Sequence, residues 1–87
     1  MYFLYILQSE KNGRYYIGST NNLKRRIIEH NSGKTRSLKY LIPLKIVFSK
    51  EYKQEHETKQ MEKKLKKFKN RNIIKRIVAE QELKLGL

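Results

Sequence analysis

The sequence predicts a small α/β (α+β) domain, in which a three-stranded antiparallel sheet is flanked by helices in the order β-β-α-β-α-α. Three observations support this fold class. Two runs of aromatic and aliphatic residues surround an Asn-Gly pair, an alternating run follows, and the basic second half spaces its apolar residues as helices do. At 87 residues the chain suits one domain, so we expect a single two-layer domain over residues 1–87.

The first two strands are expected to form a hairpin. Residues 2–8 (YFLYILQ) and residues 14–19 (RYYIGS) are rich in strand-forming residues. Asn12-Gly13 between them is a tight-turn pair, because both residues tolerate positive φ. Gly18 inside the second strand indicates that another group approaches the backbone closely at that point.

The first helix is expected over residues 23–30 (LKRRIIEH). Either Asn21 or Asn22 can cap its first turn, since a short amide side chain accepts a hydrogen bond from the free backbone N–H groups there. Asn31-Ser32-Gly33 is typical of a helix end. Residues 34–43 then read as a basic loop that closes at its proline.

The second half is expected to hold one strand and two helices. Residues 44–49 (LKIVFS) alternate as a third strand. A helix over residues 55–71 has an apolar stripe formed by Met61, Leu65 and Phe68. A last helix runs from about residue 72 into the 80s and buries Ile73, Ile74, Ile77 and Val78.

The charge of the chain points to a polyanionic partner. Lysine and arginine total 21 and acidic residues total 8, for a formal net charge of +13, which favours nucleic acid. A generally lysine-rich proteome is the alternative explanation. No apolar run reaches the roughly 20 residues that span a bilayer, and residues 1–7 lack the marks of a signal peptide. We therefore expect a cytoplasmic protein without a membrane partner.

Tyr5 and Tyr16 are expected to share one face of the hairpin. A turn at Asn12-Gly13 makes the positions of facing residues sum to 25, and any odd sum places the two tyrosines on the same face. The alternative is that both simply pack, because tyrosine is a good strand former.

Arg26 and His30 are expected to share one face of the first helix, because they stand four positions apart. Both flank the apolar stripe of Leu23 and Ile27, whereas Arg25 falls on the opposite side. A charge beside the core needs an anionic partner or a site. The alternative is an arginine lying along the rim with its guanidinium in solvent.

Glu62 is the only acidic residue among nine basic ones between Lys59 and Arg76. One carboxylate within a basic surface suits a Mg²⁺ ion that works on a phosphate, since magnesium often binds through one or two carboxylates and water. The alternative is an ordinary salt bridge to Lys66 one turn later. The basic run itself suits phosphate contacts, and otherwise is a solvated helix face.

The order and spacing of these residues resemble the GIY-YIG nuclease family. Leu4-Tyr5-Ile6 and Tyr16-Ile17-Gly18 are similar to the two halves of its signature, although Phe3-Leu4-Tyr5 stands where the family has Gly-Ile-Tyr. Further matches are Arg26, His30 with the following Asn-Ser-Gly, and Glu62 with Lys66. The resemblance covers nearly the whole chain and is nearest to the small stand-alone YhbQ-like, UPF0213-type group.

The resemblance implies a metal-dependent endonuclease that hydrolyses phosphodiester bonds in DNA, branched or damaged DNA included, in repair or recombination. Glu62 would bind one Mg²⁺ or Mn²⁺ ion, with Glu57 as the fallback carboxylate. The implied catalytic residues are Tyr5, Tyr16, Arg26, His30 and Lys66. Tyr16 is favoured as the base, and Tyr5 and His30 stay open as rivals. The expected nucleic-acid contacts are Lys24, Arg25, Lys34, Arg36, Lys63, Lys67, Lys69 and Arg71.

Two further expectations concern partners and an alternative function. Because no second domain is expected, a protein partner would supply targeting. The alternative function is a non-catalytic DNA- or RNA-binding module that keeps the fold. The joint presence of Tyr5, Tyr16, Arg26, His30 and Glu62 argues against it, because a degenerate binder would have lost at least one of them.

Overall fold

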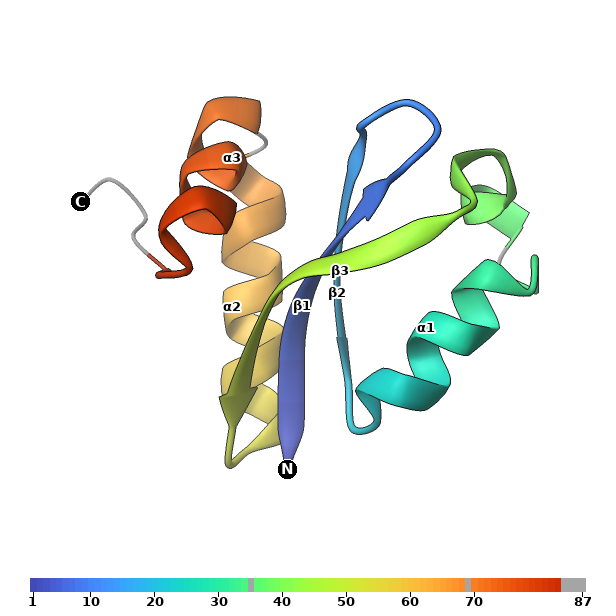
Figure 1. Cartoon of the computed structure of the whole chain (residues 1–87). Helices are drawn as coiled ribbons and strands as arrows, with labels where there is room; N and C mark the ends of the chain where they lie inside the picture. Colours follow the sequence, from blue (N-terminus) through green and yellow to red (C-terminus); the bar gives the residue numbers. More distant parts are fainter. Residues whose placement is uncertain (35, 69, 84–87) are drawn as a thin grey trace.

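The structure is a computed structural model that describes residues 1–34, 36–68 and 70–83. It confirms the predicted fold class, a three-stranded antiparallel sheet with helices (Figure 1). No helix within those residues is both long and apolar enough to cross a bilayer. The elements in chain order are β1 (Tyr2–Ser9), β2 (Tyr15–Thr20), α1 (Leu23–Asn31), the 3-10 helix η1 (Arg36–Leu41), β3 (Leu44–Tyr52), α2 (Glu55–Phe68) and α3 (Arg71–Glu80).

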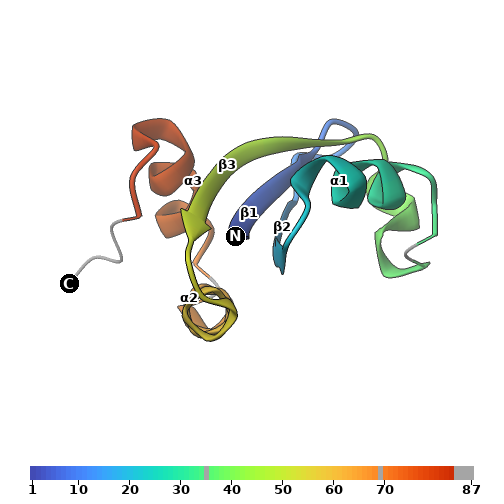
Figure 2. The ribbon, with the colours of Figure 1, turned by 90° about the horizontal axis from the view of Figure 1, so that it is seen from below.

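Strand β1 is the centre of the sheet, whose order is β2-β1-β3. Its residues Leu4 and Ile6 pack in a core cluster with α2 and α3, while Tyr5 and Leu7 belong to a second cluster with α1 and η1. Helices therefore cover both faces of the sheet, as Figures 1 and 2 show. The expected two-layer arrangement is wrong, because the central strand is apolar on both sides and each side must be covered.

The hairpin register differs from the predicted one by two positions. Tyr5 faces Gly18 and Leu7 faces Tyr16, so the positions sum to 23. A five-residue loop, residues 10–14, joins the strands, and Gly13 has a φ of 77° while Asn12 keeps negative φ. The Asn12 side chain instead accepts a hydrogen bond from the Arg14 N–H at 3.0 Å, which supports the wider loop. The sum remains odd, so the prediction that the two tyrosines share a face is confirmed.

Helix α1 is fixed at both ends by asparagine side chains. Of the two predicted caps, Asn22 is the one used, and its Oδ1 accepts from the Arg25 N–H at 3.0 Å. At the other end, Asn31 donates to the Leu44 carbonyl oxygen at 3.0 Å and accepts from the Leu44 N–H at 2.7 Å. This pair of bonds ties the end of α1 to the start of β3 and fixes the face that α1 turns toward the sheet.

The second half departs from the prediction in three places. Within the expected basic loop, η1 forms and buries Leu38. The helix predicted to residue 71 ends at Phe68, whose side chain is 40% exposed and so is not part of the buried stripe. Asn70 caps a separate helix, α3, whose Ile74 and Ile77 take over the cover of that face. The strand β3 also extends to Tyr52, three residues beyond the predicted end.

Gly18 is a glycine because the ring of Tyr5 lies against it. A Cβ atom at position 18 would stand 2.6 Å from Cζ of Tyr5, closer than real side-chain contacts allow. The expected close approach to this backbone is thus confirmed, and the group that makes it is the phenol on the facing strand.

Replacing Gly18 with alanine is expected to destabilise the protein by about 1–3 kcal/mol, because the new methyl group must displace the Tyr5 ring. Urea unfolding measures the change. In a Tyr5→Ala background the same substitution should cost less, since the ring is absent. Equal costs in the two backgrounds would contradict this packing.

Candidate active site

Tyr5 and His30 form the buried base of the site. The Tyr5 hydroxyl and His30 Nε2 lie 3.1 Å apart, and the two residues are 2% and 0% exposed. β1 supplies the tyrosine and α1 supplies the histidine. The hydrogen bond joins the centre of the sheet to the helix that covers it.

Tyr16 completes a cluster of three rings on this face. Its ring centre lies 5.5 Å from that of His30 in an edge-to-face arrangement and 6.5 Å from that of Tyr5. Tilted and edge-to-face contacts of this kind stabilise pairs of aromatic rings. Tyr16 stands on the edge strand β2 and is only half-buried, so among the three rings it is the one nearest to solvent.

Arg26 lies one turn before His30 on the same face of α1, as predicted. Its side chain is 40% exposed, yet its Nε is buried and makes no hydrogen bond within the described part of the chain. Its nearest carboxylate is Glu29, at 3.8 Å. Arg25 points elsewhere, is 61% exposed and pairs with Glu29 at 3.3 Å. The Arg26 guanidinium therefore retains donor capacity for an anion.

The pKa values at the base of the site follow from burial and from Arg26. Burial raises the pKa of the Tyr5 phenol, and the neighbouring Arg26 guanidinium only partly offsets that rise. Burial also lowers the pKa of His30, and Arg26 lowers it further. His30 is therefore a neutral imidazole near pH 7, held against a protonated phenol.

Glu62 is held on the other side of the sheet by two hydrogen bonds. Ser19 Oγ donates to one carboxylate oxygen at 2.5 Å, and Lys66 Nζ donates to the other at 2.7 Å. Burial would raise the pKa of Glu62, but these two donors outweigh it and hold the pKa below its usual value. The Glu62 side chain, 19% exposed, is thus an ionised carboxylate.

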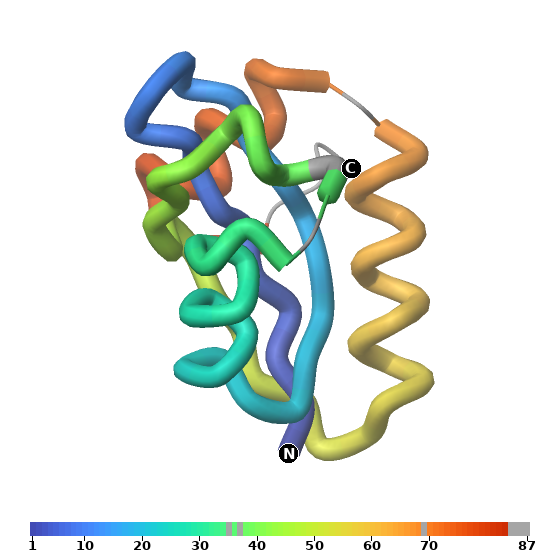
Figure 3. Tube along the Cα trace, turned by 90° about the vertical axis from the view of Figure 1, so that its right-hand side faces the viewer, coloured from blue at the N-terminus to red at the C-terminus, as the bar shows by residue number. Residues whose placement is uncertain are grey.

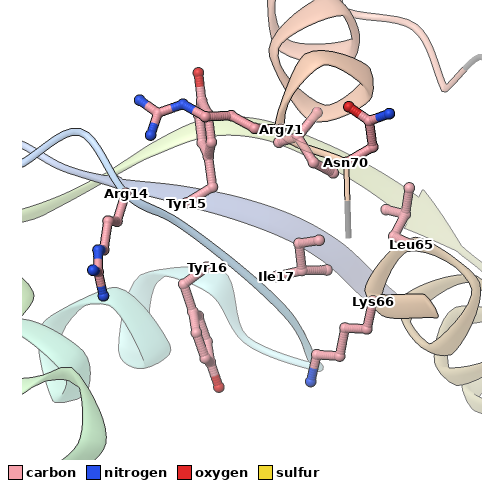
Figure 4. Close-up of a pocket in the computed structure, with 9 residues that line it drawn as sticks. Arg14, Tyr15, Tyr16, Ile17, Leu65, Lys66, Asn70 and Arg71 are labelled. Atoms are coloured by element: carbon pink, nitrogen blue, oxygen red, sulfur yellow. The ribbon is translucent and has the colours of Figure 1, made fainter. Parts of the chain in front are cut away.

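Lys66 connects Glu62 with the aromatic cluster around the edge of β2. Its Nζ lies 5.9 Å from the centre of the Tyr16 ring while it also bonds Glu62. Figure 4 shows Tyr16 and Lys66 extending in the same direction from β2 and α2. Because β2 has a free edge, groups from both faces of the sheet meet there. All six residues predicted for catalysis and metal binding therefore gather around one strand.

Most of the predicted nucleic-acid contacts lie apart from this cluster. Lys24 and Arg25 are exposed on α1, and Lys34 and Arg36 are exposed beyond its end. Lys63 and Lys67 line a hollow with Tyr52 and Glu57, on a different side of α2 from Glu62. The fallback carboxylate Glu57 is therefore not at the cluster. Arg71 lines a groove with Tyr16 and Lys66, and Lys69 lies outside the described residues.

Comparison with known proteins supports the resemblance found in the sequence. The GIY-YIG catalytic domain pattern matches residues 1–76. The chain belongs to the GIY-YIG family. This family is one of nucleases, so a nucleic-acid substrate follows at the level of the family.

Curated relatives of this GIY-YIG chain carry the name UPF0213 protein. One from Streptococcus pneumoniae serotype 4 is 32% identical over 66 residues, which cover 75% of this chain and 66% of the relative. One from Limosilactobacillus reuteri is 36% identical over 59 residues, which cover 64% and 60%. The matches thus span slightly less than two thirds of each relative. No solved structure matches the chain.

The donor set at Glu62 fits a single hydrated divalent cation. GIY-YIG nucleases are generally metal-dependent. Among the described residues, no three His, Cys, Asp or Glu side chains gather into a metal cage. The ionised Glu62 keeps lone pairs beyond those used by Ser19 and Lys66. A Mg²⁺ ion bound there would fill its shell with water and phosphate oxygens.

Sequence reasoning did not assign a role to Ser19, although it is the shortest contact of Glu62. It follows Tyr-Ile-Gly in β2, and a single serine carries no pattern that marks it. Its position directly after the Tyr-Ile-Gly motif is the one sequence feature that could have marked Ser19 as a site residue.

The free energy of unfolding is expected to fall as pH drops below about 6.5, the ordinary pKa of histidine. Below that pH the histidine of the unfolded chain takes up a proton, whereas folded His30 does so only at its lower pKa. The contribution of His30 to the free energy of unfolding is therefore complete above the unfolded pKa and is lost as the pH falls to the folded pKa. The slope approaches about 1.4 kcal/mol per pH unit.

Urea unfolding at a series of pH values measures this slope. His30→Gln should remove it, while His56→Gln, at an exposed histidine of α2, should leave it in place. A slope that survives in His30→Gln would show that His30 is not held neutral by the fold.

Ser19→Ala and Lys66→Ala are each expected to raise the pKa of Glu62, because each removes a donor to its charged form. NMR titration of the glutamate carboxyl carbons measures this pKa. Thr20→Ala, one position further along β2, is the control and should not move it. A Glu62 pKa that ignores both substitutions would rule out this arrangement.

Proposed function

We propose that this protein is a DNA endonuclease that hydrolyses a phosphodiester bond with one Mg²⁺ or Mn²⁺ ion at Glu62. The observation that carries the proposal is the meeting of three groups around β2. They are an ionised carboxylate at Glu62, a guanidinium with unused donors at Arg26 and a half-buried phenol at Tyr16. Hydrolysis of a phosphodiester needs help at the phosphoryl oxygens, the attacking water and the leaving oxygen, and these groups can serve each need.

Arg26 is proposed to bind the phosphate and to stabilise the charge that develops on its oxygens. It lines a polar hollow of about 320 Å³ together with Ser19 and Lys59, where a phosphate group has room. Its buried Nε has no partner among the described residues, and a phosphate oxygen would satisfy it. Glu29, the nearest carboxylate, lies 3.8 Å away and competes weakly for the same guanidinium.

Tyr16 is proposed to orient the attacking water and to accept its proton. Tyr5 and His30 are nearly inaccessible, whereas Tyr16 reaches the surface at the edge of the sheet. The cationic Lys66 Nζ lies 5.9 Å from the centre of its ring. His30, neutral and bonded to Tyr5, is proposed to hold the base of the site in place rather than to contact the water.

Glu62 is proposed to hold the ion, with Ser19 and Lys66 as the groups that fix its carboxylate. When bound, a divalent ion supplies charge neutralisation at the phosphoryl oxygens and at the leaving oxygen. Lys66 binds Glu62 and lies close to Tyr16, so it sets the distance between the carboxylate and the phenol. Ser19 keeps the carboxylate turned toward β2.

The ionised carboxylate also separates this proposal from a pure binding module. A surface that only binds phosphates is weakened by a negative charge at its centre. A carboxylate held ionised by Ser19 and Lys66 suits a site in which a bound cation would offset its charge. We extend the proposal to a single domain over residues 1–87 that acts in the cytoplasm, in DNA repair or recombination, with a protein partner supplying targeting.

The test is a nicking assay on supercoiled plasmid and on branched DNA with Mg²⁺, Mn²⁺ or EDTA. Glu62→Gln and Arg26→Ala are each expected to lower the cleavage rate by about 100- to 1,000-fold, since each removes a charge that acts in the transition state. Binding of the DNA, measured by fluorescence anisotropy, should persist in both.

Matched controls distinguish these effects from a loss of net charge. Glu51→Gln and Arg76→Ala alter exposed residues away from the cluster by the same charge steps, and should leave the rate unchanged. Cleavage that persists in EDTA or in Glu62→Gln would contradict the mechanism. Salt-sensitive binding of DNA without any cleavage would favour the binding module.

A further inference from the structure

A groove runs along the outer edge of β2, beside the candidate active site. Its volume is about 450 Å³, and it lies between β2, the end of α2 and the start of α3. Figure 3 shows α2 running alongside β2 on this side of the molecule. Tyr16 and Lys66 line both this groove and the catalytic cluster, so the two are continuous.

The groove combines apolar walls with cations, which a phosphate-binding surface alone would not need. Tyr15 and Ile17 of β2 form its apolar side, and Ile74 of α3 lies at its base. Arg71 stands at its far end on the Tyr15 side of β2, whereas Arg14 extends toward the Tyr16 side (Figure 4), and both are exposed. Within the described residues, neither arginine forms an ion pair with a carboxylate.

Tyr15 and Arg71 form a preassembled pair at that end. The Arg71 guanidinium lies 5.8 Å from the centre of the Tyr15 ring, and Figure 4 shows both side chains on the opposite side of β2 from Tyr16 and Lys66. A long polar contact of 3.5 Å from Arg71 to the Gly13 carbonyl oxygen helps to keep it there. Aromatic rings beside arginines are a common platform for nucleic-acid bases.

We propose that this groove, the β2-edge groove, holds an unpaired nucleotide of the substrate strand next to the phosphate at the catalytic cluster. The base lies against Tyr15 and Ile17, and the phosphate on its far side lies against Arg71. A base within a duplex hides its apolar faces in the stack, so only an unpaired nucleotide can use these walls. The inference rests on the proposed function, because the strand enters the groove from the proposed catalytic cluster.

A different occupant would be a protein segment that adds a strand to the free edge of β2. The charge of the groove favours the nucleotide. Three cations, Arg14, Lys66 and Arg71, line the groove together with its small apolar surface, and the polyanion expected at the cluster passes directly beside it. A neutral strand edge would not need this arrangement.

The test compares the affinities of the full chain for three fluorescein-labelled probes, with EDTA present so that no cleavage intervenes. The probes are a short single strand, the matching blunt duplex and the same duplex with a single-stranded overhang. Tyr15→Leu and Arg71→Ala are each expected to weaken binding of the single strand and of the overhang on the order of tenfold, while the blunt duplex changes far less.

Arg76→Ala is the matched control, because it removes the same charge from another exposed position of α3. It should weaken binding to all three probes by similar small factors. Arg71→Lys should recover only part of the loss, since it restores the charge but not the planar guanidinium. Melting curves verify that Tyr15→Leu is folded, and a 5-iodouracil cross-link to Tyr15 gives a readout that needs no substitution.

The outcomes separate this inference from the proposed function. Equal losses for Arg71→Ala and Arg76→Ala on every probe, with no cross-link at Tyr15, would overturn the nucleotide site and favour a protein occupant, even if the plasmid is nicked. A selective loss on unpaired probes together with a Tyr15 cross-link supports the site, even if the plasmid is not cleaved.

Discussion

The ring of Tyr5 occupies the space that a side chain at position 18 would fill, and the rest of the site depends on that packing. Because Gly18 has no side chain, the phenol fits against the facing strand and its hydroxyl reaches His30 on α1. The histidine in turn fixes the turn of α1 that carries Arg26. A larger residue at position 18 would shift the ring, and with it the helix face that presents the guanidinium.

The small size of the sheet explains how groups from opposite faces come to act together. Strand β2 is only six residues long and forms one edge, so α2 on one face and α1 on the other both lie within a side chain's reach of it. Lys66 spans that distance by bonding Glu62 while lying near Tyr16. In a wider sheet the same residues would be separated by further strands. A free edge thus gives this protein one site assembled from two core clusters.

The protonation states in the site are set by the groups next to each residue. The fold keeps Glu62 ionised and His30 neutral, and both are the states that nearby cations favour in a chain of formal net charge +13. The carboxylate is stabilised by donors at short range, and the imidazole is kept uncharged by burial beside Arg26. Local burial and partners therefore decide protonation here, while the net charge governs attraction of a polyanion from a distance.

Local periodicity in the sequence determined which residues share a face. The alternation of strands paired Tyr5 with Tyr16, and the helical repeat paired Arg26 with His30 and Glu62 with Lys66, because each relation spans at most a dozen positions. Only the tertiary structure decided the hairpin register, the cover on both faces, the contact of Ser19 with Glu62 and the separation of Lys63 and Lys67 from the site. Ser19 and Glu62 are 43 positions apart, so their meeting depends on how α2 is rotated against the sheet. That rotation follows from the packing of Leu65 with the core, which no local pattern specifies.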